Sequence, residues 1–174
     1  MDTIKQYIRS VPDFPKAGIN FYDITTLMKD PEGFKLALDQ MEKFVKSKDP
    51  DKLICIESRG FIFGAALSDR LDIGFVPARK PGKLPAETIS EEYELEYGTD
   101  KLEIHVDSIK TGDRIVIVDD LLATGGTMLA VCKLVEKLGG SVEGVSCVID
   151  LEFLPWREKL QAYDVNYLIS YDSE

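Results

Sequence analysis

The chain has 174 residues, and its 21 Lys and Arg against 31 Asp and Glu give a net charge of −10 at pH 7. This length predicts one domain that can bury its own core, and the excess of acid weighs against unaided binding to nucleic acid or to an anionic membrane. No stretch approaches the roughly 20 apolar residues of a membrane span, and the amphipathic start, MDTIKQYIRSV, has no apolar core of signal-peptide length. We therefore expect a cytoplasmic protein.

The spacing of apolar residues predicts helices and strands in alternation along the chain. A short helix near Thr3–Ser10 precedes an irregular segment with Pro and Gly, which contains a brief strand at Ile19–Tyr22. The elements expected after it, in order, are a helix over Pro31–Lys46, a strand over Leu53–Ile56, a helix over Gly60–Leu71, strands over Ile73–Ala78, Leu102–Val106 and Arg114–Val118, a helix over Met128–Leu138, and strands over Val142–Leu151 and Val165–Ser170. This alternation is typical of a doubly wound α/β domain with a mostly parallel sheet.

A long polar connection, Arg79–Asp100, interrupts the alternation. A connection of this length in a compact domain is usually functional or mobile. Within it, Glu91–Gly98 alternates acids with Tyr93, Leu95 and Tyr97, a pattern that an amphipathic hairpin at a sheet edge also explains.

The thiols and the single histidine exclude several kinds of site. Cys55, Cys132 and Cys147 are odd in number and lie in apolar runs without metal-ligand spacing, so we interpret them as buried and reduced. His105 is the only histidine, which excludes a mechanism that needs two histidines and a His-rich metal site.

The run Arg114–Thr127, RIVIVDDLLATGGT, predicts a buried strand, an acidic pair and a Gly-rich turn that opens a helix. Asp119 and Asp120 end the strand, at the edge where open α/β sheets bind ligands. Free backbone N–H groups and the positive end of the helix dipole would meet at Thr124–Thr127, which suits a phosphate dianion. Beside it, the carboxylates suit the vicinal hydroxyls of a ribose. The alternative is an ordinary strand–turn–helix with a capping Thr and an Asp pair in a loop.

Two further polar segments follow neighbouring strands. Glu57–Gly60 would lie near Asp119, and Arg59 there can fork onto two phosphate oxygens; alternatively, Arg59 caps a helix or pairs with Glu57. Three cations follow the next strand: Arg79, Lys80 and Lys83. They form the local basic patch that a pyrophosphate needs in an acidic protein, with a solvated charge run as the alternative.

The run Arg114–Thr127 closely resembles the phosphoribosyl diphosphate (PRPP) binding motif of type I phosphoribosyltransferases. Nearly the whole chain resembles the adenine phosphoribosyltransferases of that family, through PDFPKAGINFYDI, ESRGF, RKPGKLP, LEYG and VDDLLATGGT in that order. The resemblance implies the type I fold, with helices around a mostly parallel central sheet, a small N-terminal hood and a flexible loop. It implies one domain, residues 1–174, with a hood and base-binding segment at about 1–33 and a PRPP-binding core at about 34–174.

The activity implied by the resemblance is purine salvage, in which adenine and PRPP give AMP and pyrophosphate. It also implies a homodimer and Mg²⁺, held mainly by PRPP and water, with no direct protein ligand assigned. Enzymes for 6-oxopurines usually carry an Asp where Ala123 stands, so Ala123 supports adenine. The alternatives are another base, such as xanthine, or a regulator that binds PRPP without catalysis and acts on nucleic acid. The net charge of −10 and the presence of Glu96 and Tyr97 weigh against the regulator.

The resemblance also implies a role for each candidate site residue. The 5-phosphate turn comprises Ala123, Thr124, Gly125, Gly126 and Thr127; the ribose ligands are Asp119 and Asp120; the pyrophosphate ligands are Glu57, Ser58, Arg59, Arg79, Lys80 and Lys83; the adenine site comprises Asn20, Phe21 and Tyr22; and the catalytic group comprises Arg59, Glu96 and Tyr97. A non-proline cis peptide is expected at Glu57–Ser58. Phe21 would stack on the base, with backbone groups of Asn20 and Tyr22 at the ring edge, although burial in the core is the commonest fate of a Phe.

Overall fold

The computed structural model describes residues 4–94 and 98–172. Its centre is a parallel five-stranded sheet in the order β4-β3-β7-β8-β9. The strands are β3 (Lys52–Ile56), β4 (Gly74–Ala78), β7 (Arg114–Leu122), β8 (Ser141–Leu151) and β9 (Val165–Tyr171). The predicted α/β fold with a mostly parallel sheet is therefore confirmed.

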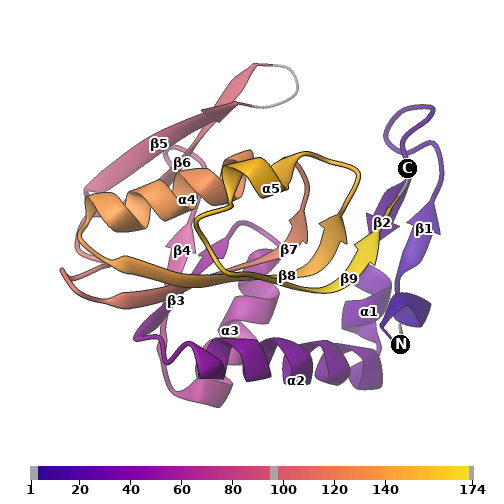
Figure 1. Cartoon of the computed structure of the whole chain (residues 1–174), viewed down its shortest axis with the longest axis horizontal. Helices are drawn as coiled ribbons and strands as arrows, with labels where there is room; N and C mark the ends of the chain where they lie inside the picture. The colour runs from indigo at the N-terminus through magenta and orange to yellow at the C-terminus, as the bar shows by residue number, and fades with distance from the viewer. Residues whose placement is uncertain (1–3, 95–97, 173–174) are drawn as a thin grey trace.

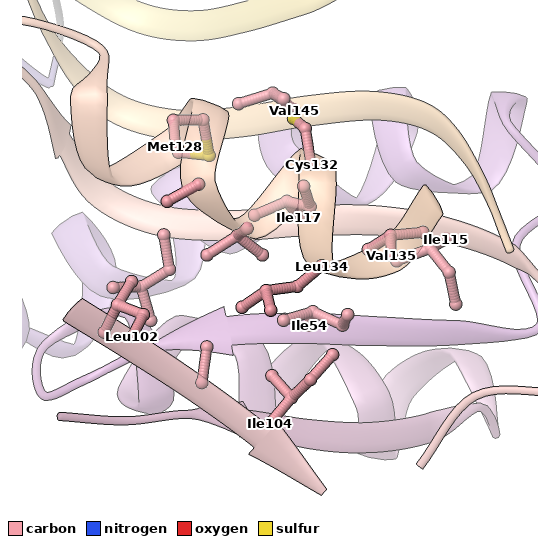
Figure 2. Packing of buried hydrophobic residues seen from close by; sticks show 14 of the residues in the cluster. Ile54, Leu102, Ile104, Ile115, Ile117, Met128, Cys132, Leu134, Val135 and Val145 are labelled. Atoms are coloured by element: carbon pink, nitrogen blue, oxygen red, sulfur yellow. The ribbon is translucent and has the colours of Figure 1, made fainter. Parts of the chain in front are cut away.

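Helices cover both faces of this sheet (Figure 1). On one face lie α2 (Pro31–Ser47) and α3 (Gly60–Leu71), and on the other lies α4 (Gly126–Lys137). Successive strand residues face opposite layers: Leu53 packs with the α2 and α3 side, and Ile54 packs with the α4 side. Figure 2 shows the layer between the sheet and α4, where Ile54 and Ile117 pack against side chains of α4. Burial on both faces explains why the strands read as continuous apolar runs.

The strand order places a ligand crevice between β3 and β7. Numbered along the chain, the sheet runs 2-1-3-4-5, so the connections leave in opposite directions from these two neighbouring strands. At such a switch point the loops after the two strands diverge and leave a crevice at their carboxyl ends. β7 also runs four residues further than the predicted strand over Arg114–Val118, because its pairing with β8 continues to Leu122.

The N-terminal segment differs most from the expected elements. The predicted helix near Thr3–Ser10 is only a 3₁₀ turn, η1 (Lys5–Tyr7), followed by strand β1 (Arg9–Val11). β1 pairs antiparallel with β2 (Phe21–Asp23), and the Arg9 guanidinium bonds the Asp23 carboxylate across the pair. A short helix, α1 (Thr25–Lys29), then leads to α2. Strand pairing across the intervening irregular segment thus overrides the local helical pattern.

The second half of the long polar connection enters a hairpin of β5 (Thr88–Glu94) and β6 (Thr99–His105). This agrees with the amphipathic hairpin considered for Glu91–Gly98 as far as Glu94, since residues 95–97 lie outside the described residues. The apolar face of the hairpin packs on α4 and leaves Leu102 and Ile104 almost fully buried (Figure 2). Reciprocal backbone bonds between Arg79 and Glu103 attach the hairpin to the end of β4. A last short helix, α5 (Trp156–Lys159), follows β8. Within the described ranges, no helix combines the length and apolarity that a membrane span requires.

Candidate active site

A cavity of about 510 Å³ lies at the switch point between β3 and β7. One wall is formed by Ile56, the last residue of β3, and by the segment Glu57–Arg59 that follows it. The other wall runs from Asp119 through Gly125 to Thr127 and Met128, and Tyr93 of the hairpin adds a side chain. The two segments predicted to meet at the sheet edge are therefore brought together.

The acidic pair forms the floor of the cavity. Asp119 is half-buried, and its Oδ1 accepts the backbone N–H of Asp120 at 2.8 Å. Burial and the neighbouring Asp120 carboxylate raise the pKa of Asp119 well above its usual value. Asp120 is 6% exposed, and its Oδ2 lies 2.8 Å from Arg59 Nε. Arg59 thus pairs with Asp120 and not with Glu57, the partner considered in its alternative interpretation.

Close packing of α3 on β7 brings Arg59 to the acids. A Cβ at Gly60 would lie 2.9 Å from both the Asp119 carboxylate and the Val118 carbonyl. Only a glycine allows the helix to begin so close to the strand, because real Cβ contacts are almost never that short. The position of Arg59 at the cavity therefore depends on the absence of a side chain at Gly60.

The Gly-rich turn lies beside the acidic pair, as expected. Gly125 caps α4 with a φ of +76°, a left-handed conformation that favours glycine. With no side chain at the cap, the first N–H groups of α4 are free to bind an anion. Gly126 differs from the expectation that it faces the phosphate. A Cβ there would meet the Glu94 carbonyl at 2.9 Å, so its Cα faces the hairpin, and Gly126 is not a lining residue of this cavity.

The Glu57–Ser58 peptide is cis, as expected from the resemblance. The Glu57 side chain is 7% exposed and accepts hydrogen bonds from all three residues of the basic patch, from two of them through the cationic side chain and from Lys80 through the backbone. Its carboxylate accepts from Arg79 Nε at 3.0 Å, from the Lys80 backbone N–H at 2.7 Å and from Lys83 Nζ at 3.1 Å. Burial acts to raise the pKa of Glu57, but these donors outweigh it and hold the pKa below its usual value.

Because the side chains of the basic patch bind Glu57 and Asp100, they are not free to point into the cavity. Arg79, Lys80 and Lys83 gather at the edge of the cavity, but their side chains do not line it. Lys80 Nζ also bonds the Asp100 carboxylate on β6, which raises the pKa of Lys80. The Glu57 carboxylate would repel a pyrophosphate, so only the backbone of this residue suits contact with one.

A second cavity, of about 340 Å³, adjoins the first and is almost wholly apolar. Its lining residues are Val11, Phe14, Phe21, Asp23, Thr25 and Arg59. The Arg59 side chain lines both cavities. Its Cζ lies 5.7 Å from the centroid of the Phe21 ring. Phe21 is only partly buried, so the interpretation of it as a core residue is wrong. The flanking side chains point elsewhere: Tyr22 stacks on Tyr171 at 3.6 Å, and Asn20 accepts from Ser10 Oγ at 2.6 Å.

Comparison with known proteins identifies the kind of site. The sequence model of the phosphoribosyl transferase domain family matches residues 26–162. An adenine phosphoribosyltransferase of Acetivibrio thermocellus is 57% identical over 169 residues, which cover 97% of this chain and 99% of the relative. The chain belongs to the adenine phosphoribosyltransferase family. It is therefore a transferase of the pentosyl-group class, as its sequence predicts.

Solved adenine phosphoribosyltransferases share the fold over the whole length. The structure from Thermoanaerobacter pseudethanolicus has a TM-score of 0.93 and 55% identity, covering 97% of this chain and 98% of its own. The Saccharomyces cerevisiae structure has a TM-score of 0.91 and 38% identity, covering 95% of this chain and 96% of its own. That yeast enzyme is complexed with D-2,5-dideoxy-2,5-imino-altritol 1,6-bisphosphate and adenine. The predicted type I phosphoribosyltransferase fold is thus confirmed.

Two residues at the site carried no predicted role. Phe14 is 51% exposed and packs edge-on against the Phe21 ring at 5.2 Å, so both aromatics of the apolar cavity come from the hood segment. Tyr93 is 9% exposed, and its hydroxyl bonds the side chains of Thr127 and Asp100. The motif PDFP signals Phe14 only as part of an irregular segment. Glu96 and Tyr97, the predicted catalytic residues of the loop, lie outside the described residues.

Proposed function

We propose that the switch-point cavity transfers the 5-phosphoribosyl group of PRPP to N9 of adenine and releases AMP and pyrophosphate. The observation that carries this proposal is the order of the surfaces. The acidic pair lies between the Thr124–Thr127 turn and the Glu57–Arg59 loop, and the apolar cavity opens beside Arg59. In PRPP the ribose likewise joins the 5-phosphate to the pyrophosphate. The base must approach ribose C1′, the same carbon that bears the pyrophosphate, so the base cavity has to lie next to the pyrophosphate loop, as it does at Arg59.

Each surface fits one part of PRPP. The open N–H groups at the start of α4, with the hydroxyls of Thr124 and Thr127, fit the 5-phosphate. The carboxylates of Asp119 and Asp120 accept hydrogen bonds, as the two ribose hydroxyls require. Arg59 lies within reach of the pyrophosphate and is already fixed by Asp120 at 2.8 Å, so little side-chain entropy is lost on binding.

The chemistry needs stabilisation of charge more than a protein nucleophile. As the bond from ribose C1′ to the pyrophosphate oxygen breaks, positive charge develops on the ribose and negative charge on the leaving group. Adenine N9 forms the new bond to C1′, and the proton of the imidazole ring of the base is released. Arg59 and the cations gathered at Glu57 stabilise the leaving group, while the acids stand beside the positive ribose. A closed site would keep water from an oxocarbenium-like centre.

The residues present fit a magnesium ion held mainly by substrate. The floor offers carboxylate oxygens, the ligand type that Mg²⁺ prefers, but Arg59 already pairs with Asp120. Among the described residues, no group of three or more His, Cys, Asp and Glu is placed to cage a metal. Asp119 and Asp120 would therefore hold the ion through water or together with ribose oxygens. When bound, Mg²⁺ neutralises charge on the pyrophosphate.

Adenine fits the apolar cavity beside Phe21, whose partly exposed ring offers a stacking surface. The extended backbone at Asn20–Tyr22 offers both N–H and C=O groups, and the base edge of adenine needs one donor and one acceptor. We assign Glu96 to the neighbourhood of base N7 and Tyr97 to the closed loop, on the resemblance alone.

A homodimer in the cytoplasm completes the proposal. β4 is an edge strand of the sheet; its residue Phe75 is 36% exposed and Ile62 of α3 is 43% exposed, which supports an interface on this side. The three cysteines are free and buried, as in a reducing compartment. The segment Arg79–Lys83, which leaves β4 on this side, could then serve the partner's site.

One assay tests the function: purified protein, PRPP and Mg²⁺ with adenine, hypoxanthine, guanine or xanthine. Hypoxanthine and guanine reverse the donor and acceptor of the ring edge, and each mismatched buried partner costs about 1–3 kcal/mol. We expect AMP and pyrophosphate from adenine, and kcat/KM for the 6-oxopurines lower by more than about 100-fold. Comparable turnover of adenine and hypoxanthine would contradict the base assignment, and PRPP binding without product would favour a regulator.

A further inference from the structure

The loop after β8 supports the Gly-rich turn from the side away from the cavity. Trp156 is the first residue of α5 and is 5% exposed. A Cβ placed at Gly125 would lie 3.0 Å from the Trp156 Cβ and 3.3 Å from its Cα. The backbone of the turn therefore packs directly against this residue, although Trp156 itself does not line the cavity.

A buried carboxylate holds the indole in place. Asp150 of β8 is fully buried, and its Oδ1 accepts the indole N–H of Trp156 at 2.6 Å. Its Oδ2 accepts from Ser170 at 3.1 Å and from Arg157 at 3.2 Å. The Arg157 guanidinium also lies 4.5 Å from the centroid of the indole. The ring is thus bonded at its nitrogen and covered on one face, so it cannot rotate away from the turn.

We propose that Asp150 and Trp156 are positioning residues for the 5-phosphate. A turn with two adjacent glycines has many backbone conformations, and only some of them aim the N–H groups of α4 at one point. The wall formed by Trp156 removes those in which Gly125 moves outward, and Asp150 fixes the wall to the central sheet. The N–H donors are then oriented before the ligand arrives, which lowers the cost of binding. This inference rests on the proposed role of the turn as the 5-phosphate site.

Two conservative substitutions test the positioning role. Trp156→Phe keeps a ring and a Cβ but removes the N–H donor, and Asp150→Asn keeps the shape but removes the charge that binds Arg157. We expect each to raise KM for PRPP and the Kd of ribose 5-phosphate by about 5–10-fold, the effect of losing one hydrogen bond of about 1 kcal/mol. KM for adenine should stay within about twofold, because the apolar cavity does not touch this loop.

The matched control is Tyr163→Phe. It removes a hydrogen bond of similar length, 2.8 Å from Tyr163 Oη to Glu136, in the same C-terminal part of the chain but away from the turn. Its KM values should match those of the unmodified protein, whatever it does to the melting temperature. If Trp156→Phe and Asp150→Asn lower the melting temperature but leave KM for PRPP unchanged, the two residues are only structural and the inference is wrong.

The unmodified protein offers a test that needs no variant. Trp156 is the only tryptophan, so tryptophan emission reports this position alone. Because the indole is fixed before the ligand arrives, saturating ribose 5-phosphate should leave the wavelength of maximum emission unchanged; a large shift would mean that Trp156 moves on binding and would overturn the proposal. Thr124→Ala distinguishes the proposed phosphate turn from the proposed positioning role of Trp156. If it leaves the affinity for ribose 5-phosphate unchanged, the assignment of the phosphate turn fails; if it weakens binding while Trp156→Phe does not, only the positioning role fails.

Discussion

The two adjoining cavities are built in opposite ways. The larger is lined by the ends of buried parallel strands, and its polar side chains are already paired with one another, as Arg59 is with Asp120. The smaller is lined by the antiparallel pair β1–β2 and the loop between them, with aromatic side chains exposed to solvent. Under the proposed function, the central sheet supplies fixed charges for PRPP, whereas a local strand pair supplies an apolar surface for the base. Substitutions in the two regions should affect different kinetic constants.

The largest effect is expected at the contact between the turn and the hairpin. Gly126→Val should lower kcat/KM for PRPP by at least about 100-fold, because its side chain must displace the Glu94 carbonyl, which lies 2.9 Å from the position of a Cβ. Gly126→Ala places only the Cβ there and should give a smaller loss. Steady-state kinetics measures both losses, and circular dichroism checks that the variants are folded. If the Ala variant is as active as the unmodified protein, the Glu94 carbonyl moves aside without affecting the site.

The next effect is expected at the floor of the larger cavity. Asp120→Asn should lower kcat/KM for PRPP by about 10-fold or more, since it weakens a charge-assisted bond to ribose worth about 1.5–3 kcal/mol and releases Arg59. Asp113→Asn is the control, because Asp113 pairs with Lys52 near the amino ends of β3 and β7. Equal loss in both variants would indicate a general effect on the fold.

In the smaller cavity the effect should be confined to the base. Phe21→Leu should raise KM for adenine by about 5-fold, as expected from a lost stacking contact of about 1 kcal/mol, and should leave KM for PRPP unchanged. Phe44→Leu, on α2 and outside both cavities, is the control. A rise in KM for PRPP with Phe21→Leu would mean that the two cavities are not separable, because Arg59 transmits the change.

The smallest effect concerns stability. The folded state raises the pKa of Asp119, so the native protein holds a proton that the unfolded chain has released, and stability falls as pH rises from about 3.8 through the folded pKa. Asp119→Asn should abolish this slope and raise the melting temperature of the unliganded protein at pH 7, because a neutral amide beside the Asp120 carboxylate needs no proton, while it lowers activity. Melting temperatures across pH, with exposed Asp107→Asn as control, measure it. If the melting temperature of Asp119→Asn is not raised at pH 7, the Asp119 and Asp120 carboxylates do not repel each other in the unliganded protein.

The sequence predicts the parts of this molecule that depend on residues near each other in the chain. Continuous β-branched runs identify β7 and β8, and the alternation of strands with helices identifies the sheet. The turn at Thr124–Thr127 is predictable because Gly125 and its neighbours form it with their own backbone. The helix expected near Thr3–Ser10 is wrong because Arg9–Val11 finds a strand partner ten or more residues away.

Side-chain contacts between residues that are far apart in the chain cannot be predicted in this way. Glu57 can be placed at the sheet edge from sequence, but nothing local shows that Arg79 and Lys83, more than twenty residues on, bind its carboxylate. The contact of Trp156 with Gly125 depends on how β8 and its following loop return over α4. Gly126 is recognisable as part of the turn, but the side on which a Cβ would lie is set by the docking of the hairpin.

The carboxylate of Glu57 gives the cation patch a permanent occupant. Its bonds to the Arg79 and Lys83 side chains and to the Lys80 backbone N–H form without any ligand. Under the proposed function, an incoming pyrophosphate therefore shares these donors with an anion that belongs to the chain itself. When the product leaves, the same carboxylate neutralises the cations again, and no unpaired charge remains to retain it. Under the proposed function, this internal anion weakens the capture of pyrophosphate and favours its release in every cycle.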